Sequence, residues 1–447
     1  MPDTPDIADR REAVCVVGAG ASGLAAVKNL REHGFEVDCY ERETAVGGAW
    51  NWRHDRSPVS AGTHLISSRP LSEFPDFPMP DTWPDYPHHS QMLSYLERYA
   101  RHFGAEDDVW FGTEVVRAVP VGDGRWDVTT RSTGGGSEER TQRYAALVVA
   151  NGHNWSPAEP EIPGEFRGQM IHSVRYKDPA QLRGRRVLVI GGGNTGCDIA
   201  VEAAQQASAV WHSTRRGYWY APKYVLGRPA DQVAERLLRW RLPLRVRQAL
   251  YGRVLALTTG DLTRYGLPRP DHRPYESHPV VNSQLPYYLG HGRITPVPDV
   301  TAFDGKQVEL ADGTRIEPDL VITATGFRPS FGFLAPELLD TGADGRPDLH
   351  LHAFARKHPT LAVIGLLQPD AGLLPLAHWQ SVAVARWLRL RLDDPVRAAN
   401  VQQKESSRPL ASWSRRRVVP SPRHWFEVDH IDYLRAVDGL LREMEPA

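Results

Sequence analysis

Residues 14–26 read VCVVGAGASGLAA, an apolar run that enters a glycine-rich turn and continues as a helical pattern. The apolar run predicts a buried strand, and the large apolar residues of 24–30 recur at helical spacing. The next residues, GFEVDCYE at 34–41, predict a second strand. Strand, glycine turn, helix and strand in this order are typical of a dinucleotide-binding βαβ unit.

Each glycine of the first motif, GAGASG, has a physical reason. Gly18 permits a tight turn, Gly20 lets the backbone approach a pyrophosphate, and Gly23 lets the helix pack closely on the strand. The helix N-terminus then points its free N–H groups at the phosphates. The motif therefore predicts a dinucleotide site.

The residues that follow fit a dinucleotide whose adenosine ribose has a free 2′-hydroxyl, such as FAD. Glu41 stands 23 residues after Gly18, where a carboxylate accepts hydrogen bonds from a ribose with a free 2′-hydroxyl. The segment TAVGGAWNW at 44–52 brings the backbone at Gly48 and the indole of Trp50 close to the same ligand. We therefore predict an FAD site here.

A second glycine motif lies in VLVIGGGNTGCDIA at 187–200, where Gly191, Gly193 and Gly196 repeat the spacing of the first. No acid stands at the equivalent ribose position, because that strand ends in Ser213, Thr214, Arg215 and Arg216. Guanidinium groups bind phosphate in bidentate fashion, so this end favours a 2′-phosphate. We predict NADPH in the second site, with hydride passing from it to FAD.

The strands before and after the second unit predict that this unit is inserted into the first domain. Residues 107–150 read as a small antiparallel meander, and two Asp-Gly turns between 300 and 323 punctuate further strands. We predict an α/β protein with two Rossmann-like domains, the NADPH domain being inserted into the FAD domain. The predicted parts are 1–165 for the first part of the FAD domain, 166–325 for the NADPH domain, and 326–447 for the second part of the FAD domain with its C-terminal helices.

Composition excludes several classes of protein. Lys and Arg number 53 and Asp and Glu 54 among 447 residues, so no global charge attracts nucleic acid or anionic lipid. Three cysteines without CxxC spacing, a polar N-terminus and the lack of a long apolar run predict a cytoplasmic protein without a stable membrane anchor. His88, His89 and His378 have no acid or Cys partners at ligand spacing, so we predict no metal site.

Several ordered motifs resemble those of the flavin-containing monooxygenases. FRGQMIHSVRY at 166–176 matches the FxGxxxHxxxY motif that identifies this family, and it lies between the two glycine turns as it does there. NGHNWSPAEPEIPG at 151–164, TATGF at 323–327 and FPDFPMP at 74–80 also look like segments of that family. The related Baeyer-Villiger monooxygenases end the motif in Trp-Pro, whereas this chain has Tyr176 and Lys177.

The resemblance implies an NADPH- and FAD-dependent monooxygenase with O₂ and a small molecule as substrates. NADPH would reduce FAD, a C4a-hydroperoxyflavin would form, and a soft nitrogen or sulfur atom would take its distal oxygen, as in N,N-dimethylaniline monooxygenase activity. The cofactors carry the chemistry, and the protein orients them and excludes water.

The resemblance also assigns site residues. FAD would be held by Gly18, Gly20, Gly23, Glu41, Gly48, Ala49, Trp50 and Ser67. NADPH would be held by Gly191, Gly193, Thr195, Gly196, Asp198, Ser213, Arg215 and Arg216. Many family members place an Asn one position before the equivalent of Ser67, but this chain has Ile66, so a hydroxyl of Ser67 or Ser68 would replace that amide.

Other functions stay open at this point. Baeyer-Villiger oxygenation of a carbonyl, an NADPH oxidase, and a reductase that passes hydride through FAD to another acceptor are alternatives. A flavoprotein that binds both nucleotides as a sensor is a further one. The sequence does not identify the substrate, and its oligomeric state is open, a homodimer being compatible with it.

Overall fold

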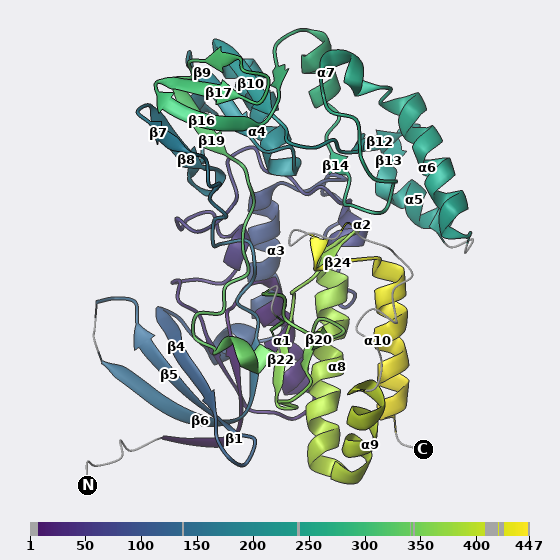
Figure 1. The fold of residues 1–447 in the computed structure, drawn as a ribbon. Coiled ribbons are helices and arrows are strands. Elements are labelled where there is room, and N and C mark those ends of the chain that lie inside the picture. The colour runs from purple at the N-terminus through teal and green to yellow at the C-terminus, as the bar shows by residue number, and fades with distance from the viewer. Residues whose placement is uncertain are drawn as a thin grey trace.

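The computed structural model describes residues 8–135, 138–238, 242–339, 341–342, 345–406, 419 and 424–445. Two layered units lie one above the other, as Figure 1 shows, the lower built on a mixed sheet and the upper on a parallel one. The first glycine turn belongs to the lower unit and the second to the upper unit.

The lower sheet contains the first glycine turn and has a parallel centre. Its strand order is β20-β21-β22-β6-β1-β2-β3, with β22, β6, β1, β2 and β3 mutually parallel. The antiparallel meander β4-β5-β6 extends it, as the sequence predicts. The strands are β1 (Ala8–Val17), β2 (Val37–Tyr40), β3 (Val109–Trp110), β4 (Thr113–Pro120), β5 (Trp126–Ser132), β6 (Glu139–Val149), β20 (Leu349–His350), β21 (Phe354–Ala355) and β22 (Leu361–Val363).

Helices from both ends of the chain cover one face of this sheet (Figure 1). Helix α1 packs against α8 and α3, and its buried side chains, including Leu24, Val27 and Leu30, lie in the largest apolar cluster. Gly34 lies in the turn that follows the helix, where its φ of +79° favours glycine. The helices are α1 (Ala21–Glu32), α2 (Arg69–Ser72), α3 (His89–His102), α8 (Leu373–Asp393), α9 (Pro395–Ser406) and α10 (His430–Met444).

The upper sheet contains the second glycine turn and is parallel throughout. Its order is β15-β10-β9-β19-β8, and α4 (Asn194–Gln206) connects β9 to β10. The strands are β8 (Gln169–His172), β9 (Arg186–Ile190), β10 (Ala209–Ser213), β15 (Thr295–Val297) and β19 (Leu320–Thr323). A smaller sheet, β18-β17-β16-β7, holds β7 (Gly164–Phe166), β16 (Val300–Gly305), β17 (Gln307–Leu310) and β18 (Arg315–Ile316).

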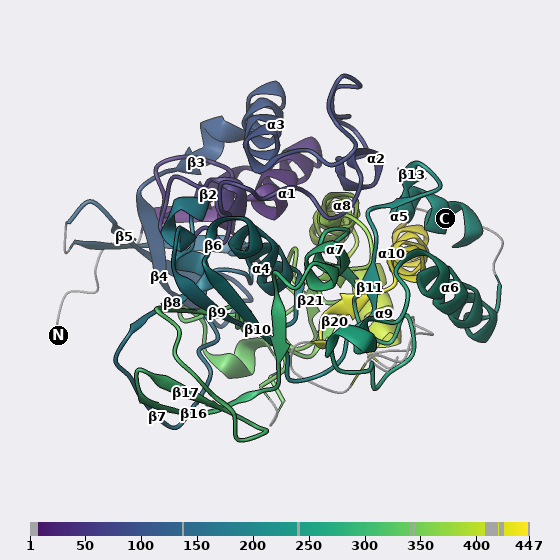
Figure 2. The same ribbon diagram turned by 90° about the horizontal axis from the view of Figure 1, so that it is seen from above.

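A helical segment leaves the upper sheet after β10 and returns at β15. It contains α5 (Ala230–Leu238), α6 (Leu244–Thr258) and α7 (Leu285–Gly290), with the short pairs β11 (Tyr220–Ala221) with β14 (Val280–Val281) and β12 (Tyr224–Val225) with β13 (Arg228–Pro229). Figures 1 and 2 both place α5 and α6 beside the start of α10. Near there, β23 (Gln368–Pro369) pairs with β24 (Glu427–Val428).

The order of the strands confirms the predicted insertion. Strand β22 pairs with β6 in the lower sheet, although all strands of the upper sheet lie between them in the sequence. The fold is therefore an α/β protein in which one Rossmann-like unit interrupts another. Among the residues that the structure describes, no helix is long and apolar enough to span a bilayer.

Candidate nucleotide-binding and active site

The first glycine of each motif is required by the same two constraints. Gly18 has a φ of +100°, and a Cβ there would lie 2.8 Å from the carbonyl oxygen of Ala150. Gly191 has a φ of +131°, and a Cβ there would lie 2.3 Å from the carbonyl oxygen of Ala324. In both units the turn presses on the end of the neighbouring parallel strand, so a side chain is excluded.

The third glycine of each motif packs the helix on the turn. A Cβ on Gly23 would lie 1.8 Å from the Gly18 carbonyl oxygen, and a Cβ on Gly196 would lie 1.9 Å from that of Gly191. Helices α1 and α4 also begin on a glycine without a side-chain cap. Their first N–H groups therefore remain suited to phosphate oxygens, and both turns fit a dinucleotide.

Glu41 lies at the end of β2, where its carboxylate fixes the first turn. Its oxygens accept backbone N–H bonds from Ala19 at 2.7 Å and from Glu43 at 2.9 Å. Burial raises the pKa of Glu41, and these two N–H groups oppose that rise. Each carboxylate oxygen has a second lone pair, so the group fits a ribose hydroxyl as well.

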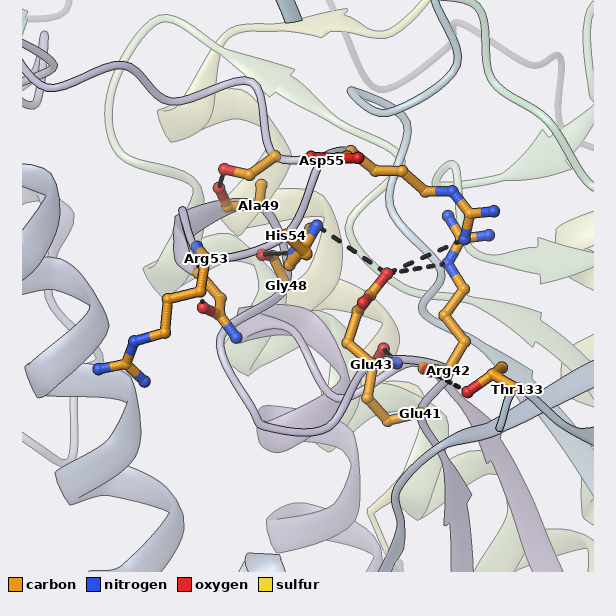
Figure 3. Close-up of polar contacts among 12 residues, drawn as sticks. Glu41, Arg42, Glu43, Gly48, Ala49, Arg53, His54, Asp55 and Thr133 are labelled. Carbon is orange, nitrogen blue, oxygen red and sulfur yellow. Dashed lines mark hydrogen bonds and ion pairs between the residues drawn. The ribbon is translucent and has the colours of Figure 1, made fainter. Parts of the chain in front are cut away.

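Figure 3 shows the polar contacts beside Glu41. The Glu43 carboxylate lies 3.8 Å from Nε of Arg42 and 3.9 Å from Nδ1 of His54. The same His54 places its Nε2 3.0 Å from the carbonyl oxygen of Gly48. This network therefore holds the turn at Gly48 next to the end of β2.

The turn at 48–50 packs on the first glycine turn. A Cβ on Gly48 would lie 2.8 Å from Cα of Gly20, so the two backbones touch. The Ser57 hydroxyl donates to the Ala49 carbonyl at 2.7 Å. Trp50 is half-buried against the apolar cluster of the lower unit.

The end of β10 carries unpaired polar atoms that suit a phosphate. Among the described residues, the buried Oγ1 of Thr214 and the buried Nε of Arg216 have no hydrogen-bond partner. Arg215 is exposed, and Arg216 also pairs with Asp271 at 3.0 Å. Ser213 differs, because its hydroxyl donates to the carbonyl of Pro298 at 2.8 Å. The arginine pair and Thr214 fit the 2′-phosphate of NADPH.

Asp198 faces the second site from α4. Its Oδ1 accepts a hydrogen bond from the Asn282 amide at 2.7 Å, and the side chain is exposed to the interior of the cavity described below. The protein around the carboxylate partly removes it from water, and this desolvation raises the pKa of Asp198 to about 6. The hydrogen bond from Asn282 and the charge of Lys223 oppose the rise. Thr195, on the first turn of α4, is exposed.

One cavity of about 2130 Å³ joins the two sites. Ten of the residues predicted from the sequence line it, from both units: Ala49, Trp50, Ser67, Gly191, Gly193, Thr195, Asp198, Ser213, Arg215 and Arg216. Among the described residues, the other predicted ones do not line it: Gly18, Gly20, Gly23, Glu41, Gly48, Ser68 and Gly196. Ala21, on the first turn of α1, does line it, so the first glycine turn borders the same space.

The two candidate serines have different environments. Ser67 lines the cavity, and its hydroxyl lies 2.8 Å from the hydroxyl of Ser72. Ser68 is fully buried, its N–H donates to Asp231, and its hydroxyl accepts from Gln232 at 3.2 Å. Of the two serines, Ser67 lines the cavity and Ser68 does not.

The FxGxxxHxxxY motif contributes β8 and the turn after it to the upper unit. His172 is buried, its Nδ1 accepts the N–H of Val174 at 3.2 Å, and its Nε2 lies 3.1 Å from the carbonyl oxygen of Gly326. The Tyr176 hydroxyl donates to the carboxylate of Glu202 on α4. These residues hold the motif against the upper sheet and carry no free nucleophile.

Sequence reasoning missed one wall of the cavity. The segment 367–374, which contains β23 and the first two residues of α8, lines it together with His430 at the start of α10. Gly365 lies just before this segment, and a Cβ there would lie 2.1 Å from the Ser22 hydroxyl on α1. The C-terminal part of the chain thus contacts the helix that follows the first glycine turn. No local sequence motif in 365–374 predicts that contact.

Two dinucleotide turns beside one cavity, the first with a buried acid at its strand end and the second with an arginine pair at its strand end, are typical of a two-nucleotide flavoprotein. The sequence profile described as flavin-binding monooxygenase-like matches residues 11–441. The chain therefore belongs to the flavin-binding monooxygenase family, and it is an NADPH- and FAD-dependent oxidoreductase.

Known proteins agree with this assignment. Flavin-containing monooxygenase 5 of Rattus norvegicus is 30% identical over 450 residues, covering 96% of this chain and 83% of its own. Dimethylaniline monooxygenase (N-oxide-forming) 2 of Mus musculus is 34% identical over 394 residues, covering 84% and 72%. Cyclohexanone monooxygenase from Rhodococcus sp. Phi1 has the same fold, with a TM-score of 0.69, 18% identity and 98% coverage of both chains.

Proposed function

We propose that this protein uses NADPH and O₂ to oxygenate a soft nitrogen or sulfur atom of a small molecule. The single observation that carries the proposal is the shared cavity, because it borders the FAD turn and the NADPH turn together. When bound, FAD accepts the hydride and activates oxygen. The mouse relative that is named for N-oxide formation supports a nitrogen substrate.

The chain's own residues would position the two nucleotides. Glu41 and the turns at Gly18 and Gly48 would hold FAD, while Thr214 and Arg215 would hold the 2′-phosphate of NADPH. Ser67 would place a hydroxyl toward the flavin, and Ile66 next to it would add apolar surface that excludes water.

A substrate panel tests this proposal. Purified protein with FAD and NADPH would be mixed with tertiary amines, thioethers and cyclic ketones, and products would be identified by mass. We expect the amines or thioethers to raise NADPH consumption and to gain one oxygen atom. NADPH consumption that yields only hydrogen peroxide, or lactones from the ketones, would contradict the proposal.

We place the domain boundaries at 1–165, 166–325 and 326–447, which the division of strands between the two sheets supports. The three cysteines are buried and form no disulfide with one another, which suits a reducing compartment such as the cytoplasm. A homodimer stays a prediction, to be tested by light scattering of the holoprotein.

A further inference from the structure

Helix α5 forms part of the cavity wall, although it belongs to the segment inserted in the upper unit. Asp231, Ala234 and Glu235 line the cavity, and their spacing of three and four residues places them on one face of the helix. Two parts of the lower unit hold this face. The cavity is therefore closed here by a contact between the two units.

The first contact joins α5 to the segment that precedes α2. The N–H of Ser68 donates to the Asp231 carboxylate at 2.5 Å, and the Gln232 amide donates to the Ser68 hydroxyl at 3.2 Å. Ser68 is fully buried and adjoins Ser67, which lines the cavity. This contact fixes the N-terminal turn of α5.

The second contact joins α5 to the C-terminal part of the chain. Nδ1 of His430 lies 2.7 Å from the Asp370 carboxylate, and Nε2 lies 2.9 Å from the Glu235 carboxylate. All three side chains line the cavity, with 11–20% of their surface exposed. A carboxylate accepts hydrogen bonds, so both ring nitrogens donate and the imidazole is doubly protonated. The bridge is therefore a cation between two anions.

We propose that His430 is a positioning residue, whose bridge between Glu235 and Asp370 fixes α5 across the cavity and keeps water out of it during turnover. Asp370 lies in the segment 367–374, which the Gly365 contact brings to the first glycine turn. The bridge thus connects the FAD side of the cavity directly to the inserted helix. The role in turnover rests on the proposed function, whereas the role in holding α5 does not.

Hydrogen exchange tests the holding role without any activity. Holoprotein with His430→Gln would be compared with the wild type by the exchange of peptides from α5, with peptides from α4 as internal reference. Glutamine is uncharged and cannot place donors at both ring-nitrogen positions, so the two carboxylates would face each other without a cation between them, and we expect about tenfold faster exchange in α5 and no change in α4. Equal exchange of α5 in the two proteins would overturn the proposal.

A matched control comes from another buried histidine. His350 lies 2.9 Å from the Glu405 carboxylate, is similarly buried, and does not line the cavity among the described residues. His350→Gln should leave the exchange of α5 unchanged, and acceleration equal to that of His430→Gln would contradict a specific bridge. If His430→Gln does not fold, Glu235→Met carries the same comparison, because it removes the acceptor of the His430 Nε2–H group and keeps the length of the side chain.

The role in turnover has a separate readout. Hydrogen peroxide released per NADPH consumed, measured without substrate, should rise several-fold in His430→Gln and stay at the wild-type value in His350→Gln. Faster exchange of α5 with an unchanged peroxide yield would refute the exclusion of water. If the wild type consumes no NADPH, the proposed function fails, and the exchange measurement still decides whether His430 holds α5.

Discussion

At the scale of single residues, glycines at equivalent positions let the helix pack closely on the glycine turn in both units. Gly23 and Gly196 do not have positive φ, so only the close approach of a carbonyl oxygen, at 1.8 and 1.9 Å from an ideal Cβ, excludes a side chain there. The reason for each glycine is therefore steric contact between helix and turn.

Alanine at these two positions should separate the two sites. Gly23→Ala should lose FAD, and Gly196→Ala should keep FAD but lose NADPH binding, each with a loss of about 1–3 kcal/mol in unfolding free energy from overpacking. FAD released on denaturation and NADPH titration measure the two effects.

A control for the alanine variants lies in an open turn. A Cβ on Gly122 would meet no atom within 4 Å, so Gly122→Ala should bind both nucleotides as the wild type does. FAD retained by Gly23→Ala at the wild-type level would show that the helix can move away from the turn, against the steric argument.

The arginine at the end of β10 should set the choice of nicotinamide nucleotide. Arg215→Ala should raise the KM for NADPH about 10- to 100-fold, since charge-assisted hydrogen bonds to the 2′-phosphate are worth about 1.5–3 kcal/mol. The KM for NADH should change by less than about threefold, because NADH lacks that phosphate. Steady-state kinetics with both nucleotides measure this, and equal losses would show that Arg215 has another role.

Two variants at the end of β10 test whether the hydroxyl of Ser213 or that of Thr214 binds the 2′-phosphate of NADPH. Ser213 donates to the carbonyl of Pro298, whereas Thr214 Oγ1 is buried without a partner among the described residues. Thr214→Val should therefore weaken NADPH more than NADH, while Ser213→Ala should lower stability with little change in that preference. The reverse result would restore Ser213 as the phosphate ligand.

At the scale of elements, the βαβ units could be predicted because their signals are local. The apolar runs, the glycine spacing and the strand ends at Glu41 and Arg215 all lie within about 30 residues, the length of one such unit. The wall made by α5 and by 367–374 could not be predicted, because its contacts join residues such as Glu235 and His430 that are 195 positions apart. No sequence pattern specifies which distant histidine meets which acid.

The His430 bridge gives the stability of this wall a definite dependence on pH. Burial alone lowers the pKa of His430, but the hydrogen bonds to Asp370 and Glu235 outweigh it and raise the pKa to about 10. The contribution to stability is thus complete below the ordinary histidine pKa of about 6.5 and is lost as pH rises toward 10. Asp429, which pairs with Arg247 at 3.2 Å, and Tyr251 are further ionisable groups on the packed elements.

Unfolding free energies at pH 7 and pH 10 measure this dependence. The loss of stability between the two values should be larger in the wild type than in His430→Gln, because the variant has no group there to deprotonate. Lysines and tyrosines titrate alike in both proteins, so the difference between them isolates His430. Parallel curves would contradict a raised pKa at this residue.

The tyrosine that ends the FxGxxxHxxxY motif should stabilise the upper unit. Tyr176→Phe removes the hydrogen bond to the half-buried Glu202 carboxylate, and we expect a loss of about 1–3 kcal/mol in urea denaturation. Tyr287→Phe is the control, since that side chain is 58% exposed and its change should cost little. Equal stability of Tyr176→Phe and the wild type would contradict a stabilising role for the Tyr176 hydroxyl.

At the scale of the whole molecule, the proposed function depends on two nucleotide sites that border one cavity between the units. The family and the pair of cofactors follow from motifs in the sequence, and the sequence profile over residues 11–441 confirms the family. The meeting of the sites depends on how the two sheets face each other, which only the three-dimensional arrangement gives (Figure 1).

The most direct test of this arrangement is the reduction of bound FAD by NADPH without oxygen. Stopped-flow mixing of anaerobic holoprotein with NADPH should bleach the flavin absorbance in one phase whose rate saturates with NADPH, and Arg215→Ala should need more NADPH to reach the same limiting rate. Flavin that stays oxidised while NADPH is bound would contradict the claim that the two nucleotides meet in one cavity.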